Sequence, residues 1–288
     1  MVGAIPTNFF NMGGVNMPIF NMVGGGGYKD AGLAWTDVNY TGFTEGNCAV
    51  AVVYDNEIHI LYVSSGQGKH IKWNGNSFTN VSTLPYYFNN GSVVVLNNEI
   101  HILGSKSNPT FHYKWDGSTW KEVSTLPYPF SGGSAVVLNN EIHILGSAYG
   151  GYHDLHYKYN GSNWKSVSTL PYEFWKGSAV VLDNEIHILG GYTNSTLHYK
   201  WNGSRWTRVS TLPYKFSNGS AVVYDNHINI LGGSGEENAY YEYINNKWSK
   251  IRPLPHNFID GSAVVYDGEF NIFAEGYHSV FGKVYKKV

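Results

Sequence analysis

The sequence is poor in charge. Asp, Glu, Lys and Arg make up 14% of its 288 residues, where about 25% is usual for a globular protein. With 19 basic and 21 acidic side chains the formal charge is −2, so the chain lacks the basic surface that binds nucleic acid. It has a single cysteine, Cys48, so no disulfide can form within the chain and cysteine usage does not indicate a redox compartment.

Long apolar runs are also missing. No stretch approaches the roughly 18 consecutive apolar residues of a membrane-spanning helix, so we expect no membrane insertion. Residues 1–28 carry no charged side chain, so the positively charged start of a secretory signal is not present. The chain is instead rich in aromatic residues, which make up 16% and include 9 Trp and 23 Tyr.

One stretch occurs six times with small changes. Its clearest copy begins at Gly177 and reads GSAVVLDNEIHILGG. The copies repeat every 42 to 44 residues, and a period of this size is typical of solenoids, propellers and repeat arrays. Six copies fill nearly everything after residue 28, which predicts one domain. The other copies begin near Ala49, Gly91, Gly133, Gly219 and Gly261.

Each copy contains four short segments that read as β-strands, named a to d. Strands a and b are runs of β-branched residues separated by Asp183-Asn184, and such a pair tolerates the positive φ of a tight hairpin turn. Strands c and d are separated by Asn202-Gly203, a second hairpin signal. In the clearest copy the expected strands are 178–182 (a), 185–189 (b), 197–201 (c) and 206–209 (d).

A double glycine after strand b, followed by a tyrosine and then a tryptophan, resembles the Kelch repeat. The resemblance is strongest in Gly190-Gly191, Tyr199 and Trp206, and it covers roughly residues 28–288. The double glycine becomes Gly104-Ser105 in an earlier copy. Kelch repeats of this length imply propeller blades with four strands each. The resemblance implies the fold, and it does not by itself transfer the functions of the family.

The sixth copy ends without a strand d. It stops just after a c-like segment at 281–285, whereas the start of the chain contains Trp35–Val38, which matches Trp206–Val209. We therefore expect an all-β fold: a six-bladed β-propeller of four-stranded antiparallel blades, closed by this N-terminal strand. The predicted domains are an extended N-terminal arm, 1–27, and the propeller, 28–288.

Eight histidines recur at two positions of the repeat. Equivalent positions on neighbouring blades are about 10 Å apart, too far for shared metal ligation with bonds of about 2 Å. The b and c histidines of one blade can approach each other, but no acidic or cysteine ligand recurs beside them. We therefore predict structural packing and no metal or cofactor. The histidines are His59, His101, His143 and His187 in strand b, and His70, His112, His156 and His198 in strand c.

The other ionisable residues also recur in step with the repeat. Five glutamates begin strand b in the same context, whereas a catalytic acid needs one special environment. Galactose oxidase-type enzymes and Kelch-type sialic acid mutarotases are enzymatic precedents on such propellers, but no site of theirs maps onto this sequence residue by residue. We predict that the protein is not an enzyme and has no catalytic residue. The glutamates are Glu57, Glu99, Glu141, Glu185 and Glu269.

Variation within the chain indicates where a ligand would bind. In an antiparallel blade the b–c loops and the d-to-a crossings share one face, and both change from copy to copy. The third b–c loop, 147–154, is two residues longer than the others, and the crossing after it contains a unique tryptophan. Aromatic rings beside carboxylates suit a sugar. The predicted ligand-binding residues are Tyr149, Tyr152, His153, Asp154, Glu173 and Trp175.

The first 27 residues differ from the rest. All four methionines lie there, Asn-Met recurs three times, and Gly24–Gly27 follows as a hinge. An uncharged, apolar arm on a soluble propeller favours a partner surface, and methionine suits adaptable packing. The alternative is an unattached tail. The predicted assembly residues are Phe9, Phe10, Met12, Met17, Phe20 and Met22.

The repeats are also similar in style to Kelch-like proteins of phage and prophage tails of Gram-positive bacteria. This resemblance implies a non-enzymatic virion protein, anchored to other tail proteins through residues 1–27 in a homo-multimeric assembly. Its propeller would bind a host-surface glycan during host attachment. The alternatives are a bacterial extracellular carbohydrate-binding module and a Kelch-type sugar-modifying enzyme.

Overall fold

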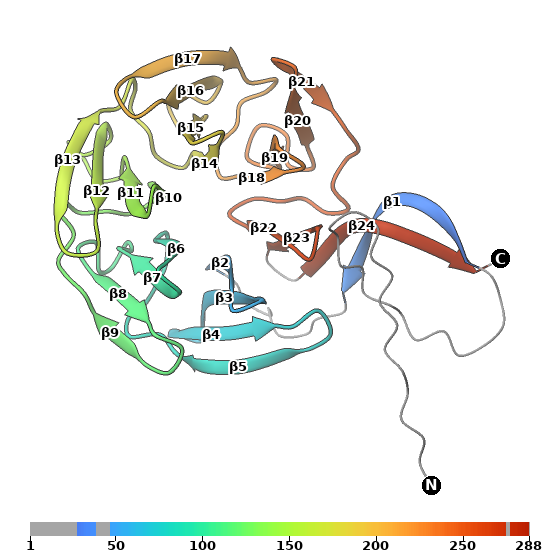
Figure 1. Cartoon of the computed structure of the whole chain (residues 1–288), viewed down its shortest axis with the longest axis horizontal. Helices are drawn as coiled ribbons and strands as arrows, with labels where there is room; N and C mark the ends of the chain where they lie inside the picture. The colour runs from blue at the N-terminus through green and yellow to red at the C-terminus, as the bar shows by residue number, and fades with distance from the viewer. Residues whose placement is uncertain (1–27, 39–46, 275–276, 288) are drawn as a thin grey trace, which may run out of the picture.

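The computed structural model describes residues 28–38, 47–274 and 277–287, which form 24 strands in six four-stranded antiparallel sheets. The sheets are arranged as blades around a common axis (Figure 1). In each blade the strand order from this axis outward follows a, b, c, d. This confirms the predicted six-bladed β-propeller.

The first three blades lie in chain order around the ring. Blade 1 consists of β2 (Asn47–Tyr54), β3 (Glu57–Ser64), β4 (Gln67–Trp73) and β5 (Phe78–Thr83). Blade 2 consists of β6 (Ser92–Leu96), β7 (Glu99–Leu103), β8 (His112–Trp115) and β9 (Trp120–Glu122). Blade 3 consists of β10 (Ser134–Leu138), β11 (Glu141–Leu145), β12 (Leu155–Tyr159) and β13 (Trp164–Thr169).

The remaining blades complete the circle. Blade 4 consists of β14 (Ser178–Leu182), β15 (Glu185–Leu189), β16 (Leu197–Trp201) and β17 (Trp206–Thr211). Blade 5 consists of β18 (Ser220–Tyr224), β19 (His227–Leu231), β20 (Tyr240–Ile244) and β21 (Lys247–Lys250). Blade 6 consists of β22 (Ser262–Tyr266), β23 (Glu269–Ala274), β24 (Tyr277–Lys287) and β1 (Tyr28–Val38).

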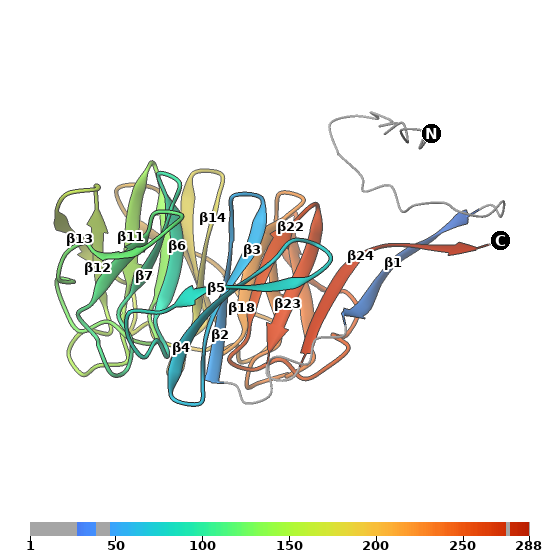
Figure 2. The ribbon, with the colours of Figure 1, turned by 90° about the horizontal axis from the view of Figure 1, so that it is seen from below.

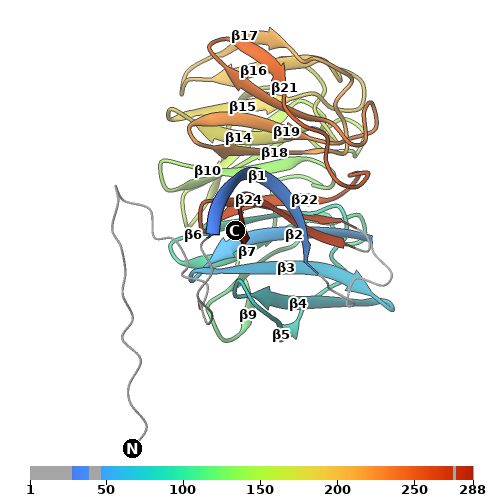
Figure 3. The ribbon, with the colours of Figure 1, turned by 90° about the vertical axis from the view of Figure 1, so that its right-hand side faces the viewer.

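Blade 6 is closed by the N-terminal strand, as predicted. Strand β1 pairs antiparallel with β24, and Trp35 lies opposite Phe281. Both strands are longer than the sequence pattern indicated, because the pairing continues outward until Tyr28 lies opposite Lys287. The two strands leave the ring as a twisted ribbon (Figures 2 and 3).

The hairpin turns follow the predicted chemistry. Asp183 and Asn184 have φ of 51° and 60°, and Asn and Asp accept such left-handed values more readily than most residues. The pairing of strands c and d contains a feature that the sequence did not reveal: between His156 and Tyr157 the register shifts by one residue. This bulge places Ser168 opposite His156.

The core lies between the blades. Each d-to-a crossing with the frame Leu-Pro-x-x-Phe inserts its phenylalanine fully, with no exposed surface, and the side chain packs on the next blade. A cavity of about 330 Å³ lies at the centre of the ring and is lined by valines and one alanine of the innermost strands. No helix in the described part of the chain has the length and hydropathy to cross a membrane. The fully buried phenylalanines of the crossings are Phe88, Phe130, Phe174, Phe216 and Phe258.

Candidate functional site

The b–c loops and the d-to-a crossings meet on one face of the ring, which we call the loop face. The backbone N–H of Phe174, in a crossing, donates to the carbonyl oxygen of His153 in a b–c loop at 2.8 Å. The same bond joins Phe216 to Ser195 at 2.8 Å. These bonds fix the loops against the crossings, so the variable side chains of both are held on a rigid surface.

An aromatic stack stands on the loop face between blades 3 and 4. The rings of Trp175 and Tyr192 are 4.4 Å apart and tilted by 30°, and the ring of His153 lies 6.2 Å from Trp175 on a similar tilt. We call these three residues the aromatic stack. Tyr192 is 61% exposed, so the stack ends in an aromatic ring that is open to solvent.

Backbone bonds hold the two large rings together. The N–H of Tyr192 donates to the carbonyl oxygen of Trp175 at 2.9 Å, which brings the b–c loop of blade 4 onto the crossing that precedes it. The equivalent bond in the next blade joins Ser234 to Ser217 at 2.8 Å. The backbone is therefore shared between blades, whereas the aromatic pair occurs only where the crossing supplies Trp175.

The tautomer of His153 is set by one bond. Its Nδ1 lies 2.6 Å from the carbonyl oxygen of Ser147, and because a carbonyl only accepts, Nδ1 carries the hydrogen. In the neutral ring Nε2 is then an acceptor. The stack thus combines two rings that can pack on C–H groups with one nitrogen that can accept a hydroxyl hydrogen.

The structure brings only part of the predicted ligand-binding set together. His153 and Trp175 join the stack, and Glu173 is exposed on the same crossing. Asp154, half-buried, accepts a hydrogen bond from the backbone of Leu170 through its carbonyl oxygen at 2.7 Å. These four residues lie on the loop face near blades 3 and 4, and their role in ligand binding stays a prediction.

The two tyrosines of the long loop are placed differently. Tyr152 stacks on Tyr128 at 5.8 Å and 12° and packs against the core between blades 2 and 3. The hydroxyl of Tyr149 donates to the carbonyl oxygen of Lys106 at 2.6 Å, which ties the loop to blade 2. Both side chains therefore support the loop, and neither contributes a ring to the aromatic stack.

Tyr192 was not among the ligand-binding residues predicted from the sequence. The signal available was an aromatic residue directly after Gly190-Gly191, at a loop position that holds Ser234 in the next copy. That signal points to a site only once the crossing and the loop are known to touch. The predicted assembly residues Phe9, Phe10, Met12, Met17, Phe20 and Met22 lie outside the described residues.

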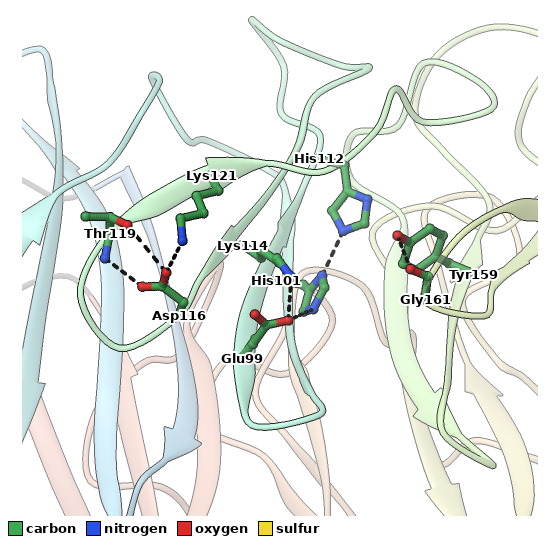
Figure 4. A network of polar contacts seen from close by, with 9 residues as sticks. All are labelled: Glu99, His101, His112, Lys114, Asp116, Thr119, Lys121, Tyr159 and Gly161. Carbon is green, nitrogen blue, oxygen red and sulfur yellow. Dashed lines mark hydrogen bonds and ion pairs between the residues drawn. The ribbon is translucent and has the colours of Figure 1, made fainter.

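The paired histidines lie inside the blades, away from the loop face. In blade 2, His101 Nδ1 lies 2.8 Å from His112 Nε2, as Figure 4 shows. Burial lowers the pKa of His101 from 6.5 to about 4 and that of His112 to about 3. Within the described residues no three His, Cys, Asp or Glu side chains are grouped as metal ligands.

Four of the five recurring glutamates form an ion pair with a lysine. Glu99 pairs with Lys114 at 2.8 Å across strands b and c (Figure 4), and the same pair occurs in blades 1, 3 and 4. In blade 5 the carboxylate lies in strand c instead, because His227 begins strand b and Glu242 in strand c lies 3.0 Å from it. The glutamates begin strand b, as predicted, and their pairs recur from blade to blade.

One group of catalytic residue types occurs on blade 6, but its connections are wrong for nucleophilic catalysis. The hydroxyl of Ser279 donates to Asp37 at 2.5 Å, and His256 lies 3.1 Å from the same carboxylate. A nucleophilic serine needs the histidine as its direct partner. The Ser279 bond is the main cause that lowers the pKa of Asp37, followed by His256.

Comparisons with known proteins agree with the architecture. The solved structure titled "Structure of YjhT" superposes with a TM-score of 0.68 at 11% sequence identity, over 84% of this chain and 95% of that chain. No protein-family model and no curated protein matches the sequence. At this identity the likeness shows the fold alone: the chain is a six-bladed β-propeller.

Proposed function

We propose that this protein is a non-enzymatic carbohydrate-binding propeller, and that the aromatic stack on its loop face is the binding site. The observation that carries the proposal is the exposed ring of Tyr192, backed by Trp175 and held by backbone bonds. A large aromatic ring left open to water on a rigid surface is a common feature of recognition sites.

The chemistry of the stack suits a sugar ring. The C–H face of a pyranose packs on an aromatic ring, which removes apolar area from water. Its hydroxyl groups can donate to carboxylates, and Glu173 and Asp154 are the carboxylates nearest in sequence to the stack. His153 Nε2 offers a further acceptor because its Nδ1 is already used.

We further propose that the propeller is a component of a phage tail. The support is the similarity of the repeats to Kelch-like tail proteins, together with the uncharged, methionine-rich arm at 1–27. In this proposal the arm binds other virion proteins in a homo-multimeric assembly, and the loop face meets a glycan of the host surface. The protein would then act in host attachment.

An extracellular carbohydrate-binding module is the second candidate. It is favoured by the position of the aromatic stack, which lies on blades 3 and 4 and makes no use of the N-terminal strand in blade 6. Such a module would be a monomer with a dispensable arm. Light scattering of the full chain and of a chain lacking residues 1–27 distinguishes the two: the tail protein loses a multimer, whereas the module does not change.

The binding site is tested with substitutions that the chain itself uses elsewhere. Trp175→Ser with Tyr192→Ser reproduces the Ser217 and Ser234 pair of the next blade, so we expect the melting temperature to change little. A glycan array that includes Gram-positive cell-wall polysaccharides identifies the ligand, and calorimetry then measures the affinity of both proteins. We expect the double substitution to weaken binding at least tenfold, because the stacking surface is lost.

The control is Ser217→Ala with Ser234→Ala, which changes the equivalent positions without touching the stack. It should bind like the parent. If the doubly substituted protein melts normally and also binds the glycan like the parent, the site lies elsewhere. If the array is blank for the parent itself, carbohydrate binding is wrong.

A further inference from the structure

We propose that the ring has a built-in opening point: β1 is a releasable strap, and the seams on either side of blade 6 part before any other seam. The opening of the ring does not depend on glycan binding. Within the described residues, four seams share a set of contacts that the two seams beside blade 6 lack.

Four seams are crossed by the same polar chain. Between blades 3 and 4 the Nε1–H of Trp206 donates to Ser168 Oγ at 3.1 Å. The hydroxyl of Ser168 is then free to donate to His156 Nδ1 at 3.0 Å. His156 Nε2–H in turn donates to the histidine of strand b, His143, at 2.8 Å. Each nitrogen and oxygen from Trp206 Nε1 to His143 Nδ1 has a partner on this path, which is what burial demands. In blade 2 the same path is complete, although the far nitrogen of its last histidine, His101 Nε2, has no hydrogen-bond partner among the described residues.

The same chain recurs at three other seams with nearly the same distances. The tryptophan lies in strand d of one blade, and the serine and histidines lie in the blade before it. The tryptophan-to-serine distances are 3.0 Å for Trp120 and Ser82, 3.2 Å for Trp164 and Ser124, and 3.0 Å for Trp248 and Ser210.

Among the residues that the structure describes, no such chain crosses the seam between blades 6 and 1. Phe78 occupies the tryptophan position and touches His278 through its ring, 5.7 Å between centroids. Next to its strand-c histidine, strand β1 pairs without the bulge that β5, β13 and β17 show there, so Val38 lies opposite His278. His278 is fully buried, and its Nδ1 has no hydrogen-bond partner among the described residues. Opening of this seam would let water form a hydrogen bond with Nδ1, so the unpartnered buried nitrogen favours the open state.

The seam between blades 5 and 6 departs in a second way. Trp35 of β1 meets Tyr240 edge to face at 6.4 Å, so a tyrosine takes the place of the strand-c histidine. Arg252 also takes the place of the serine, because it lies four residues after Trp248, just as Ser210 lies four residues after Trp206. In strand b, Asn229 replaces the histidine, and its buried Oδ1 has no hydrogen-bond partner in the part of the chain that the structure describes.

The crossing into blade 6 also loses a buried bond. In the four preceding crossings a tyrosine hydroxyl donates to the carbonyl oxygen of a glycine after strand b, as Tyr172 does to Gly190 at 3.0 Å. In the crossing into blade 6, His256 stands in place of this tyrosine. Its Nε2 lies 3.1 Å from a carboxylate oxygen of Asp37 in β1. Both side chains are more than a third exposed, and exposed pairs contribute little because water and salt screen them.

The covalent arrangement makes β1 easy to release. In every other blade strand d is joined to strand c by a short turn, as Trp206 is joined to Trp201 through residues 202–205. Strand β1 comes from the opposite end of the chain and is held to β24 by non-covalent contacts: backbone pairing, packing and the Ser279–Asp37 hydrogen bond. Its departure therefore breaks no strand pairing in the other five blades.

Amide hydrogen exchange of the full chain tests the inference. We compare residues 35–38 and 278–281 in blade 6 with the equivalent paired residues of β16 and β17 in blade 4. We expect the blade 6 amides to exchange at least tenfold faster at neutral pH. Equal rates in the two blades would overturn the proposal.

A disulfide gives an independent measurement. Thr36→Cys with Val280→Cys joins two residues that lie opposite each other in β1 and β24, in a background with Cys48→Ser. The matched control is Lys200→Cys with Thr207→Cys, the equivalent pair in blade 4. We expect the first disulfide to slow exchange in blade 6 to the level of blade 4 and to be reversed by reductant. A control disulfide that slows blade 6 equally, or a blade 6 disulfide without effect, would contradict a local opening.

Discussion

The paired histidines of blades 1 to 4 depend on being uncharged. In blade 1, His59 Nδ1 lies 2.7 Å from His70 Nε2, so one nitrogen must donate and the other must accept. A proton added to His59 would place two N–H groups against each other. Burial is the main cause that lowers the pKa of His59 to about 4 and that of His70 to about 3.

We therefore predict a fall in stability on acidification. An unfolded histidine titrates near 6.5, whereas these residues stay neutral in the folded protein until pH 4 or 3. Between those values the unfolded state binds more protons, so the free energy of unfolding decreases as pH falls from 6.5. Each histidine contributes about 1.4 kcal/mol per pH unit in this window. Urea unfolding at pH 7.0, 5.5 and 4.5 measures the effect, and equal stability at all three values would contradict it.

At this scale the sequence is informative about repeated residues and silent about single ones. Spacing alone showed that the two histidines of a blade can meet. The bond from Trp206 to Ser168 could not be foreseen, because it joins different blades and depends on a bulge. The roles of Tyr152 and Tyr192 were also hidden: the first faces the core and the second faces solvent, although both are loop tyrosines.

In blades 2 to 5 the glycine after strand b lies directly against the crossing into the following blade. Gly146 has φ of 61°, and a Cβ built on it would collide with the carbonyl oxygen of Phe174 in the following crossing. The second residue of the motif is less constrained, since Ser147 is accepted in blade 3, where Gly191 stands in blade 4. This explains why the double glycine of the repeat decays at its second position.

Gly146→Ala should therefore destabilise the protein by about 3 kcal/mol or more, through collision in addition to backbone strain. The matched control is Gly161→Ala. Gly161 also has a positive φ, 93°, but nothing lies within 4 Å of its added methyl group, so only about 1 kcal/mol of strain is expected. Thermal unfolding of both proteins separates the two effects. Equal losses would show that the crossing moves aside.

Elements with a regular pattern were predictable from sequence, and their irregular ends were not. The a–b hairpins and the strand order followed from turn residues and β-branched runs. The outward extension of β1 and β24 did not, because Tyr28–Ala34 carries no strict alternation of apolar and polar residues. Pairing with a strand from the far end of the chain decides that extension.

The whole ring depends on its first strand. Because β1 completes blade 6, a chain without residues 1–38 has a three-stranded blade with an exposed inner strand edge. We predict that this deletion lowers the melting temperature by roughly 10 °C or more and promotes aggregation through the exposed edge. Deletion of residues 1–27 is the control, since it retains β1, and it should leave melting unchanged. The prediction is wrong if both deletions melt like the full chain.

The ends of the described chain lie side by side, since Tyr28 is opposite Lys287 at the tip of the β1–β24 ribbon. Tension between the two ends would peel the ribbon one residue pair at a time, at low force. Tension between the arm and a ligand held on the loop face acts differently. It pulls β1 lengthwise against β24, so all nine paired positions resist together. A propeller tethered by one end only is thus loaded in shear, the stronger direction for a pair of strands.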